Sequence, residues 1–320
     1  MRVSFAALSR AGVLGINRRN IEYVLRWNPR RFYPNVDDKL QTKRLCQTAG
    51  IPTPRLLAAA SHHFEVRNLL GALEGCDSFV LKPARGAMGN GIVVVYSRSG
   101  KRFRVSGGRE VPEAELRYHA AGIISGLYAL AGHQDVAVVE ERLEIHPELR
   151  ALTHEGVPDL RVIVYRGVPV MAMLRLPTRR SRGRANLHQG AIGVGIDLTR
   201  GRTVGGVYRN HLVDENPETG HVLAGHAVPE FARALAIAVA ATDQMGLQYV
   251  GADVVVDAER GPVILELNAR PGLVIQIANR AGLLPRLRAV DGRVCPALSV
   301  SQRIALGVEI AGEHGAGAAA

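Results

Sequence analysis

Residues 251–272 constrain the fold of this chain more than any other part of its sequence. Two apolar runs joined by a polar turn at 257–261 predict a β-hairpin. Because side chains alternate along a strand, Asp253 lies on one face of the first strand, and Glu266 and Asn268 share a face of the second. Polar side chains on such apolar strands need an explanation. A half-solvated strand edge is one explanation, and a metal site is another.

Magnesium accounts for such a group of oxygen atoms. The ion takes hard oxygen ligands, and proteins usually hold it with one or two carboxylates together with the phosphates of a substrate. The Arg270-Pro-Gly sequence directly after the second strand favours a metal site over a strand edge. The hairpin therefore predicts a magnesium site in which Asp253, Glu266 and Asn268 are the candidate ligands.

A glycine-rich loop follows a short strand in the first half of the chain. Residues 79–82 and 92–96 predict two strands. The loop that joins them contains Gly86, Met88, Gly89 and Gly91. Glycines let the backbone approach an anion closely, and Lys82 adds a positive charge, so the loop suits phosphates. The alternative is an ordinary hairpin tip, because the loop has neither the Gly-Lys-Ser/Thr ending of a Walker A sequence nor the helix of a dinucleotide fingerprint.

Two further segments carry candidate binding residues. A strand predicted at 136–140 runs into Glu140 and Glu141, where strand-end groups can read adenine and a carboxylate can accept from its amine. Farther along, Arg175 precedes the basic segment 184–190, and guanidinium groups bind carboxylates and phosphates through paired hydrogen bonds. The alternatives are a solvated strand end and a solvated basic loop.

The order of elements predicts an α+β fold with its cleft between lobes. At 320 residues the chain exceeds one ordinary domain. The expected helices are a basic helix within 9–31 that is followed by an irregular Asn28-Pro29 turn, a helix capped by Asp37 or Asp38 and running to Ala49, a helix over 113–131, and one containing Phe231, Leu235 and Val239. The expected C-terminal elements are strands 159–165 and 170–176, a basic loop at 177–184, a hairpin over 190–208 and the hairpin described above.

The formal net charge of +11 indicates anionic partners. It fits nucleic acid, an anionic membrane surface, or phosphorylated and acidic small molecules. The densest basic cluster, residues 179–184, has no aromatic residue among its arginines, which weakens a base-stacking surface. Acidic substrates are therefore favoured over nucleic acid.

Location is predicted from apolar runs and cysteines. No apolar run approaches the roughly 20 residues that a membrane-crossing helix needs, and no hydrophobic block follows the first arginines. We therefore expect no signal peptide, no membrane insertion and a cytoplasmic location. Cys46, Cys76 and Cys295 lack CxxC spacing, which predicts reduced thiols and neither a disulfide framework nor a zinc site.

Taken in order, these motifs resemble those of the ATP-grasp superfamily. The similarity covers roughly residues 37–281 and includes Lys39, Lys82 with its glycine loop, and the final hairpin. The sequences Asp159-Leu-Arg161, Asn186-Leu-His188 and Gly251-Ala-Asp253 are similar to those of the glutamate ligases that modify the C-terminus of a ribosomal protein. The D-alanyl-D-alanine ligases share the scaffold but place an arginine where this chain has Gly251. The resemblance therefore identifies an α-L-glutamate ligase-like ATP-grasp protein.

The resemblance implies how ATP would be held. Lys39 and Lys82 would contact its phosphates, and the loop with Gly86, Met88, Gly89 and Gly91 would close over them. Glu140 would accept from the adenine amine, the backbone of Glu141 and Leu143 would read the ring, and Asp159 would meet the ribose.

The resemblance also implies the chemistry. Asp253, Glu266 and Asn268 would hold one or two Mg²⁺ ions, or Mn²⁺. The candidates for contact with the γ-phosphate, the acyl-phosphate and the carboxylate substrate are Arg161, Arg175, Arg184 and Asn186. The implied activity is the ADP-forming ligation of a carboxylate, glutamate first, to an amine on a peptide or small molecule. His188 is either a base for that amine or a structural hydrogen-bonding residue.

The expected organisation is a short basic segment over 1–36, an N-lobe over 37–143, a C-lobe over 144–312 and a flexible tail over 313–320. ATP-grasp ligases normally begin with a further substrate-binding lobe, and 1–36 is too short for one. The basic opening segment, a partner protein or a second copy would then complete the acceptor site. The alternatives to a ligase are a catalytically silent ATP-binding regulator and a nucleic-acid binder that uses the arginine loop.

Overall fold

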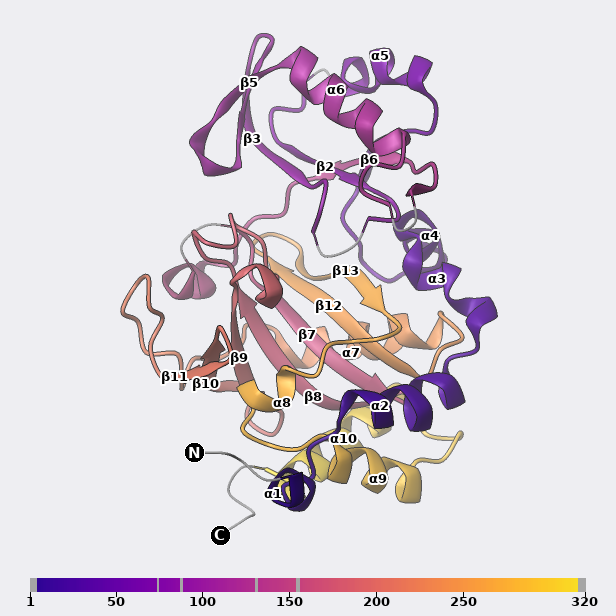
Figure 1. Ribbon diagram of the computed structural model, residues 1–320. Helices are drawn as coiled ribbons and strands as arrows, with labels where there is room; N and C mark the ends of the chain where they lie inside the picture. The colour runs from indigo at the N-terminus through magenta and orange to yellow at the C-terminus, as the bar shows by residue number, and fades with distance from the viewer. Residues whose placement is uncertain (1–4, 74, 87–88, 130–131, 154–155, 316–320) are drawn as a thin grey trace.

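Two antiparallel sheets and the helices packed on them make up the computed structural model (Figure 1), which describes residues 5–73, 75–86, 89–129, 132–153 and 156–315. The first sheet has six strands in the order β1-β6-β2-β3-β4-β5. These strands are β1 Leu56–Ala60, β2 Phe79–Pro83, β3 Val93–Ser99, β4 Arg102–Val105, β5 Glu110–Pro112 and β6 Ala137–Glu141. Helices α5 (Val66–Leu69) and α6 (Glu113–Ile124) pack on this sheet.

The second sheet has seven strands in the order β11-β10-β9-β8-β7-β12-β13. They are β7 Asp159–Tyr165, β8 Val168–Leu176, β9 Ile192–Asp197, β10 Arg202–Tyr208, β11 His211–Val213, β12 Tyr249–Asp257 and β13 Gly261–Asn268. The predicted division between residues 143 and 144 falls in the connection from β6 to β7.

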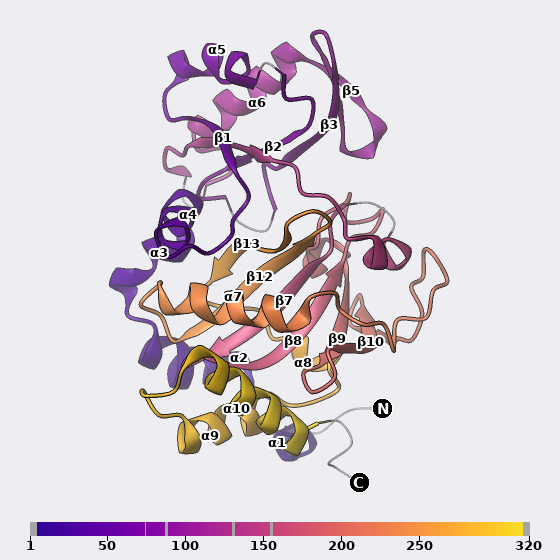
Figure 2. The same ribbon diagram turned by 180° about the vertical axis from the view of Figure 1, so that it is seen from behind.

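Helices cover the two faces of the seven-stranded sheet differently. Helices α7 (Phe231–Asp243) and α10 (Val300–Glu313) lie on the face seen in Figure 2. On the face seen in Figure 1 lie α2 (Ile16–Arg18) and α8 (Ile275–Ala278), with α1 (Phe5–Arg10) and α9 (Leu284–Arg293) below them. Helices α3 (Pro34–Asp37) and α4 (Lys39–Thr48) lie between the two sheets along one side. No helix in the described ranges has both the length and the apolar character needed to span a bilayer.

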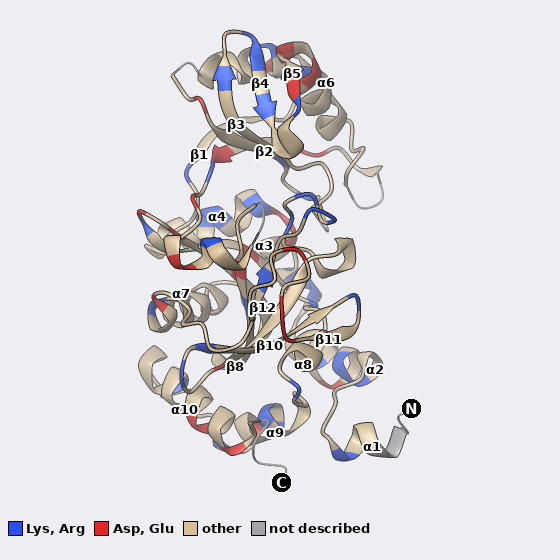
Figure 3. Ribbon diagram, turned by 90° about the vertical axis from the view of Figure 1, so that its left-hand side faces the viewer, with Lys and Arg blue, Asp and Glu red and all other residues tan. Residues whose placement is uncertain are grey.

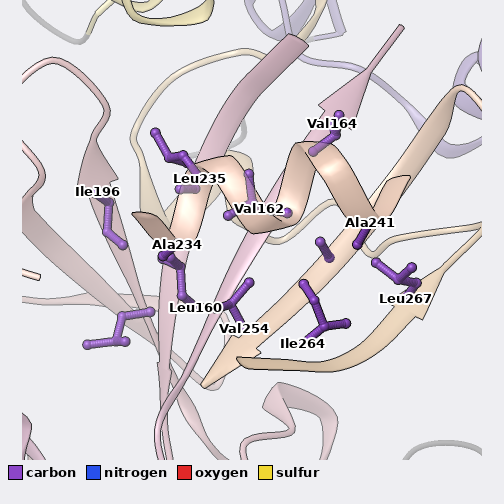
Figure 4. Close-up of a cluster of buried hydrophobic side chains, with 14 of the residues drawn as sticks. Leu160, Val162, Val164, Ile196, Ala234, Leu235, Ala241, Val254, Ile264 and Leu267 are labelled. Atoms are coloured by element: carbon purple, nitrogen blue, oxygen red, sulfur yellow. The ribbon is translucent and has the colours of Figure 1, made fainter. Parts of the chain in front are cut away.

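The main core explains which side chains are left to face the cleft. Leu160, Val162 and Val254 pack with Ala234 and Leu235 of α7 in one buried cluster (Figure 4). Because side chains alternate along a strand, the residues between them point to the opposite face of the sheet. Helix α7 does not cover this opposite face. Part of it therefore forms the floor of a site.

Most predicted elements are confirmed. The helix capped by Asp38 is α4, in which the Asp38 carboxylate accepts from the Leu40 and Gln41 N–H groups. The strand predicted at 159–165 is β7, and the hairpin predicted at 190–208 is β9 and β10. Residues 177–184 form turns with no helix or strand, as expected for the basic loop.

Two predicted helices differ. The basic helix predicted within 9–31 is not continuous, because Gly12 has a φ of +67° and separates α1 from α2, after which a π-helical stretch, Arg19–Leu25, follows. The irregular turn predicted at Asn28-Pro29 is confirmed, since neither residue lies in a helix or strand. The helix predicted over 113–131 ends at Ile124, where Gly126 takes a φ of +83°. Glycine adopts these left-handed conformations without the strain that a side chain would cause.

Asn28 ties the N-terminal segment to the sheet. Its Nδ2 donates to the carbonyls of Tyr249 (2.8 Å) and Ala269 (2.9 Å), and its Oδ1 accepts from the N–H groups of Gln248 (3.1 Å) and Tyr249 (3.0 Å). Asn28 is 1% exposed, so water cannot replace these partners. The N-terminal segment is thereby fixed at the start of β12 and just beyond the end of β13.

Replacing Asn28 with alanine is expected to lower the free energy of unfolding by roughly 2–4 kcal/mol, since buried backbone groups lose their partners. Urea denaturation measures the change. Asn17→Ala, at an exposed position of α2, is the matched control and is expected to stay within about 0.5 kcal/mol of the parent. Equal midpoints for the two variants would contradict the role given to Asn28.

Candidate functional site

A cavity of about 1560 Å³ lies between the two sheets. Strands β2, β3 and β6 of one sheet and β7, β8, β12 and β13 of the other contribute to its lining. Figure 3 shows segments that carry Lys and Arg in this region between β2 and β12. The predicted site residues in the lining are Lys39, Lys82, Gly86, Gly89, Glu140, Glu141, Leu143, Asp159, Arg161, Arg175, Arg184, Asn186, Asp253, Glu266 and Asn268.

Two predicted site residues remain. Met88 lies outside the described residues. Gly91 is buried, with a φ of +76°, and its carbonyl accepts from Nε2 of His119 at 2.8 Å. Gly91 therefore supports the end of the glycine loop.

Charged residues lie side by side across the floor of the cavity. Asp253 on β12 pairs in register with Glu266 on β13 and with Arg161 on β7. The Arg161 guanidinium bonds both Asp253 oxygens through Nε and Nη2, the latter at 2.7 Å. Arg175 donates through Nη2 to Asp253 and through both Nε and Nη2 to Asp159, at 2.5–2.6 Å. Two arginines and two carboxylates thus form one buried network.

The network shifts the proton affinities of its members. Burial alone would raise the pKa of Asp253, but the guanidinium groups of Arg161 and Arg175 outweigh burial and lower it. Burial raises the pKa of Asp159 to about 6, although Arg175 opposes the shift. Burial would lower the pKa of Arg175, but Asp159 and Asp253 raise it. Asp253 is therefore ionised and holds two permanently charged arginines in place.

A β-bulge shapes the strand that carries the candidate metal ligands Glu266 and Asn268. The pairing of β12 with β13 shifts register after Asp253, which is opposite Glu266, so that Val254 is opposite Ile264. Leu265 has no partner in this ladder, and it lines the cavity together with Glu266 and Asn268. Strict alternation predicts that Glu266 and Asn268 share one face of β13. It does not predict that Leu265 also lines the cavity, which the bulge explains.

The donor chemistry of this floor fits a magnesium ion. Glu266 and Asn268 are partly exposed, line the cavity, and supply carboxylate and amide oxygens. Asp253 has both oxygens bonded to arginines, and Nδ2 of Asn268 lies 3.4 Å from its Oδ2. Within the described residues no group of three or more His, Cys, Asp or Glu side chains is placed to hold a metal. Two protein ligands suffice where substrate phosphates complete the shell.

Glu140 has two lysine partners. Nζ of Lys82 lies 2.5 Å from one carboxylate oxygen and Nζ of Lys43 lies 3.1 Å from the other. Lys43 also donates to the carbonyl of Pro54. Burial would raise the pKa of Glu140, but Lys82 and Lys43 lower it. The carboxylate predicted to accept from adenine thus pairs with a predicted phosphate-binding lysine and with a second lysine.

Lys43 was not among the predicted residues, although the sequence holds a signal for it. It follows Lys39 by four positions in α4, and side chains at this spacing share one face of a helix. Lys39 itself donates from Nζ to the carbonyl of Gly86 at 2.8 Å. The same face of α4 therefore supplies two cations: Lys39 bonds the glycine loop, and Lys43 pairs with Glu140.

The glycine loop approaches the basic loop of the other lobe at Gly89. A Cβ atom at Gly89 would lie 3.4 Å from Cδ of Arg184. Arg184 donates from Nη1 to Oε1 of Gln189 at 3.1 Å, and burial lowers its pKa. Asn186 caps the short 3₁₀ turn Leu187–Gln189 by accepting from the His188 N–H at 2.9 Å. The approach of Gly89 to Arg184 therefore brings the glycine loop and the basic loop together at the cavity.

Glu141 and Leu143 form the connection at the predicted adenine position. The Glu141 N–H donates to the carbonyl of Arg55 at 3.0 Å, and its carboxylate accepts from the Arg55 N–H at 2.7 Å. Leu143 is buried and packs with Val255 and Val263. This part of the cavity is therefore bounded by an apolar contact between the β6–β7 connection and the β12–β13 hairpin.

Gly251 is the position at which the sequence departs from the D-alanyl-D-alanine ligases. A Cβ atom there would lie 2.7 Å from Cβ of Pro271 and 3.2 Å from Cδ of Arg161. The chain after β13 and the Arg161 side chain therefore fill the space that a side chain would take.

Several lining residues carried no clear signal in the sequence. Arg19 is buried, and its Nη1 donates to the carbonyl of Pro271 at 2.8 Å. Arg270 and Arg280 also line the cavity. These arginines come from opposite ends of the chain, so only the folded structure brings them together.

Two antiparallel sheets that enclose a cleft, with a glycine loop and lysines on one side and oxygen ligands on the other, define the ATP-grasp fold. A family model described as sugar-transfer associated ATP-grasp matches residues 18–292. The chain therefore belongs to this family. The superfamily prediction is confirmed, whereas the closer relation to the ribosomal-protein glutamate ligases stays a prediction. No curated protein matches the chain by sequence.

Solved structures are similar to this chain at low identity. The ATP-grasp ligase PsnB, solved with a minimal precursor, has a TM-score of 0.41 at 18% identity and covers 83% of this chain. D-cycloserine synthetase DcsG has a TM-score of 0.45 at 16% identity, with 83% of this chain and 72% of that chain covered. A D-alanine–D-alanine ligase from Bacillus anthracis has a TM-score of 0.44 at 15% identity, with 88% and 68% covered. The match spans 62% of the PsnB chain.

Proposed function

We propose that this protein is an ATP-dependent carboxylate–amine ligase that forms an amide or peptide bond through an acyl-phosphate. The observation that carries the proposal is the single cavity in which Lys39, Lys82 and the glycine loop face Glu266 and Asn268. Cations and hard oxygen ligands on opposite walls suit a nucleotide triphosphate between them. Membership of an ATP-grasp family supports the same conclusion.

The nucleotide would lie along β6 and under the glycine loop. Glu141 and Leu143 would border the adenine, Asp159 the ribose, and Lys39 and Lys82 the phosphates, with Gly86 and Gly89 in the closing loop. Glu140 takes a positioning role in this proposal, because both of its oxygens bond lysines and hold Lys82 in place.

Glu266 and Asn268 would hold Mg²⁺, which supplies positive charge to the transferring phosphoryl group when bound. Asp253 belongs to the same floor, and its bonds to Arg161 and Arg175 make it the residue that orients those arginines. Guanidinium groups that are held in this way are already positioned to stabilise the negative charge that develops on the phosphoryl group during its transfer.

The chemistry requires positioning and no protein nucleophile. A carboxylate oxygen of the substrate attacks the γ-phosphorus of ATP, the bond to the β–γ bridging oxygen breaks, and ADP leaves. The nitrogen of the amine then attacks the acyl carbon, phosphate departs with the electron pair of the broken C–O bond, and the nitrogen loses a proton. Arg161, Arg175 and Arg184, with Asn186 beside them, would contact the anionic groups of both steps.

The carboxylate in this proposal is glutamate or a similar amino acid, and the amine belongs to a peptide or small molecule. The glutamate assignment rests on the sequence resemblance. A partner protein or second copy that contributes to the acceptor site stays a prediction.

Product analysis tests the proposed activity. The protein, ATP and magnesium would be incubated with pooled amino acids and cell extract, and mass spectrometry would search for new amides. We expect ADP release that requires both a carboxylate and an amine, with one product heavier than its amine by the acid minus water. Tight ATP binding without ADP formation across the screen would instead identify a catalytically silent regulator.

A further inference from the structure

Arg19 is a buried cation of the cavity wall that has no carboxylate partner among the described residues. Three lining cations in the described part of the chain are less than a tenth exposed: Arg19 at 7%, Lys82 at 4% and Arg161 at 8%. Lys82 pairs with Glu140, and Arg161 pairs with Asp253. The printed bonds of Arg19 go to neutral acceptors. A buried charge without an opposite charge is costly, so an anion that entered the cavity would stabilise Arg19.

The guanidinium of Arg19 keeps donors for a ligand. Nη1 donates to the Pro271 carbonyl at 2.8 Å, and Nε and Nη2 donate to Oδ1 of Asn20 at 3.1 and 2.7 Å. These bonds use three of the five N–H groups of a guanidinium. The remaining two, one on each terminal nitrogen, can donate to the oxygens of a carboxylate.

The charges next to Arg19 do not compensate it. Burial lowers the pKa of Arg19, Tyr249 opposes this shift, and Arg270 adds to it. Arg270 is itself exposed, its guanidinium carbon lies 5.2 Å from the ring centroid of Tyr33, and its charge acts on the exposed carboxyl group of Asp37. Arg19 therefore has a second cation nearby, and this surrounding favours an anionic ligand over a cationic one.

The carboxylates that line the same cavity are engaged elsewhere. Glu266 is the proposed metal ligand, and the others form ion pairs with cations other than Arg19. These pairs are Glu140 with Lys43 and Lys82, Glu141 with Arg55 and Arg260, Glu144 with Arg142, Asp159 with Arg175, and Asp253 with Arg161 and Arg175. The cavity as a whole thus contains both signs of charge, whereas the described surroundings of Arg19 supply no carboxylate to it.

Arg19 reaches the cavity on the substrate side of the metal ligands. The connection at the proposed adenine position packs against Val263, at the start of β13. Asn268 ends β13 and is opposite Gly251, where an added Cβ atom would lie 2.7 Å from Cβ of Pro271. Because Arg19 donates to the Pro271 carbonyl, it lies at the end of β13 that carries Asn268, and not at the end that borders the adenine position.

The segment that carries Arg19 is fixed on both sides of it. Before Arg19, Gln276 accepts from the Leu14 N–H at 2.8 Å and donates to the Leu14 carbonyl at 3.1 Å. After Arg19, Asn28 bonds the start of β12. A cation that is held in place before its ligand arrives loses little freedom on binding.

We propose that Arg19 binds a substrate carboxylate that takes no part in the bond formed. One of the two substrates then carries a carboxylate in addition to its reacting group. This inference rests on the proposed ligase function and names a substrate class for it: either the carboxylate substrate is a dicarboxylate, or the amine is an amino acid with a free carboxyl group.

Pairs of ligands that differ only by a carboxylate or an amide test the subsite. Glutarate against glutaramate forms the dicarboxylate arm, and L-alanine against L-alaninamide forms the amine arm. Calorimetry with the protein saturated by magnesium and a non-hydrolysable ATP analogue gives each dissociation constant. We expect the carboxylate member of one pair to bind roughly 10- to 100-fold more tightly than its amide, which is the effect of hydrogen bonds to a charged group. The pair that shows this preference identifies the substrate concerned.

Matched variants assign the preference to Arg19. Arg19→Gln is expected to remove most of it, and Arg19→Lys, which keeps the charge without the planar donor group, is expected to keep part of it. Arg18→Gln removes the same charge from the neighbouring position, where Arg18 pairs with Glu22 on the surface and does not line the cavity, and it is expected to keep the full preference. A purely structural role for Arg19 would weaken both members of a pair equally. Thermal unfolding checks that each variant is folded.

Four results would overturn the carboxylate subsite: no binding of any probe, equal affinity within both pairs, an undiminished preference in Arg19→Gln, or an equal loss in Arg18→Gln. If Arg19→Gln does not fold, an undiminished preference in Arg19→Lys overturns the subsite instead. Failure to bind the ATP analogue would count against the proposed function, whereas nucleotide binding with equal affinity within both pairs would count against the carboxylate subsite alone.

Discussion

Glu266→Ala is expected to lower the rate of ADP formation by roughly 10²–10³-fold, the effect typical of removing one group that stabilises transition-state charge. Glu266 is the one carboxylate of β13 and a proposed ligand of magnesium. Asp253 cannot replace it, because Arg161 and Arg175 hold both Asp253 oxygens. A coupled assay of ADP release, at saturating ATP and over a range of magnesium concentrations, measures the effect.

Glu259→Ala is the matched control for Glu266. Glu259 lies in the exposed turn of the same hairpin, and its backbone N–H bonds Oδ1 of Asp257 at 3.1 Å, so the turn persists in the variant. We expect the control to retain the parent rate. A Glu266→Ala protein that melts like the parent and releases ADP within a few-fold of its rate would refute the metal assignment.

Glu140→Ala is expected to destabilise the protein by about 3–5 kcal/mol, because it leaves Lys43 and Lys82 buried without an opposite charge. Both lysine side chains are about as buried as Glu140 itself, with exposed fractions of 6% and 5% against 4%. Urea denaturation of the variant checks the loss. The same variant is expected to bind ATP more weakly, since Lys82 loses the partner that fixes its position.

Glu110→Ala supplies the contrast for Glu140. Glu110 pairs with Arg102 on the surface, with both side chains 62% exposed, and such pairs contribute about 0–1 kcal/mol. An equally small change in the Glu140 variant would contradict the buried lysine pair.

The stabilisation that Glu140 provides is lost as the pH falls. Its pKa is lower in the folded protein than in the unfolded chain, so the unfolded chain binds more protons as the pH falls. The stabilisation is present above the unfolded pKa of about 4.3 and is lost as the pH drops through the folded value. The Glu140→Ala protein should therefore lose less stability than the parent below about pH 4.3.

The sequence predicted those structural features that depend on local patterns of residues. Alternation along β13 put Glu266 and Asn268 on one face, and a capping carboxylate at Asp37 or Asp38 predicted the start of α4, whereas the bulge that sets Asp253 opposite Glu266 was not predicted. The spacing of Lys39 and Lys43 held further information, because a four-residue separation puts both on one face of that helix. These features depend on neighbours in sequence or on a single hairpin.

Contacts between distant segments could not be predicted in this way. Arg161 and Arg175 precede Asp253 by 92 and 78 positions, so nothing in the hairpin itself shows that its carboxylate is already bonded. The break at Gly12 likewise has a tertiary reason, since a Cβ atom there would meet the ring of Pro285.

The bonds of Asn28 and Gln276 also determine which parts of the protein can move together. Asn28 donates to the Tyr249 carbonyl, and Gln276 accepts from the Leu14 N–H, so the N-terminal segment is joined to the sheet that carries Glu266 and Asn268 and to the chain that follows it. The glycine loop and Lys82 belong to the other sheet. A hinge motion between the sheets would therefore move the glycine loop and Lys82 relative to Glu266 and Asn268, while the N-terminal segment stayed with Glu266 and Asn268.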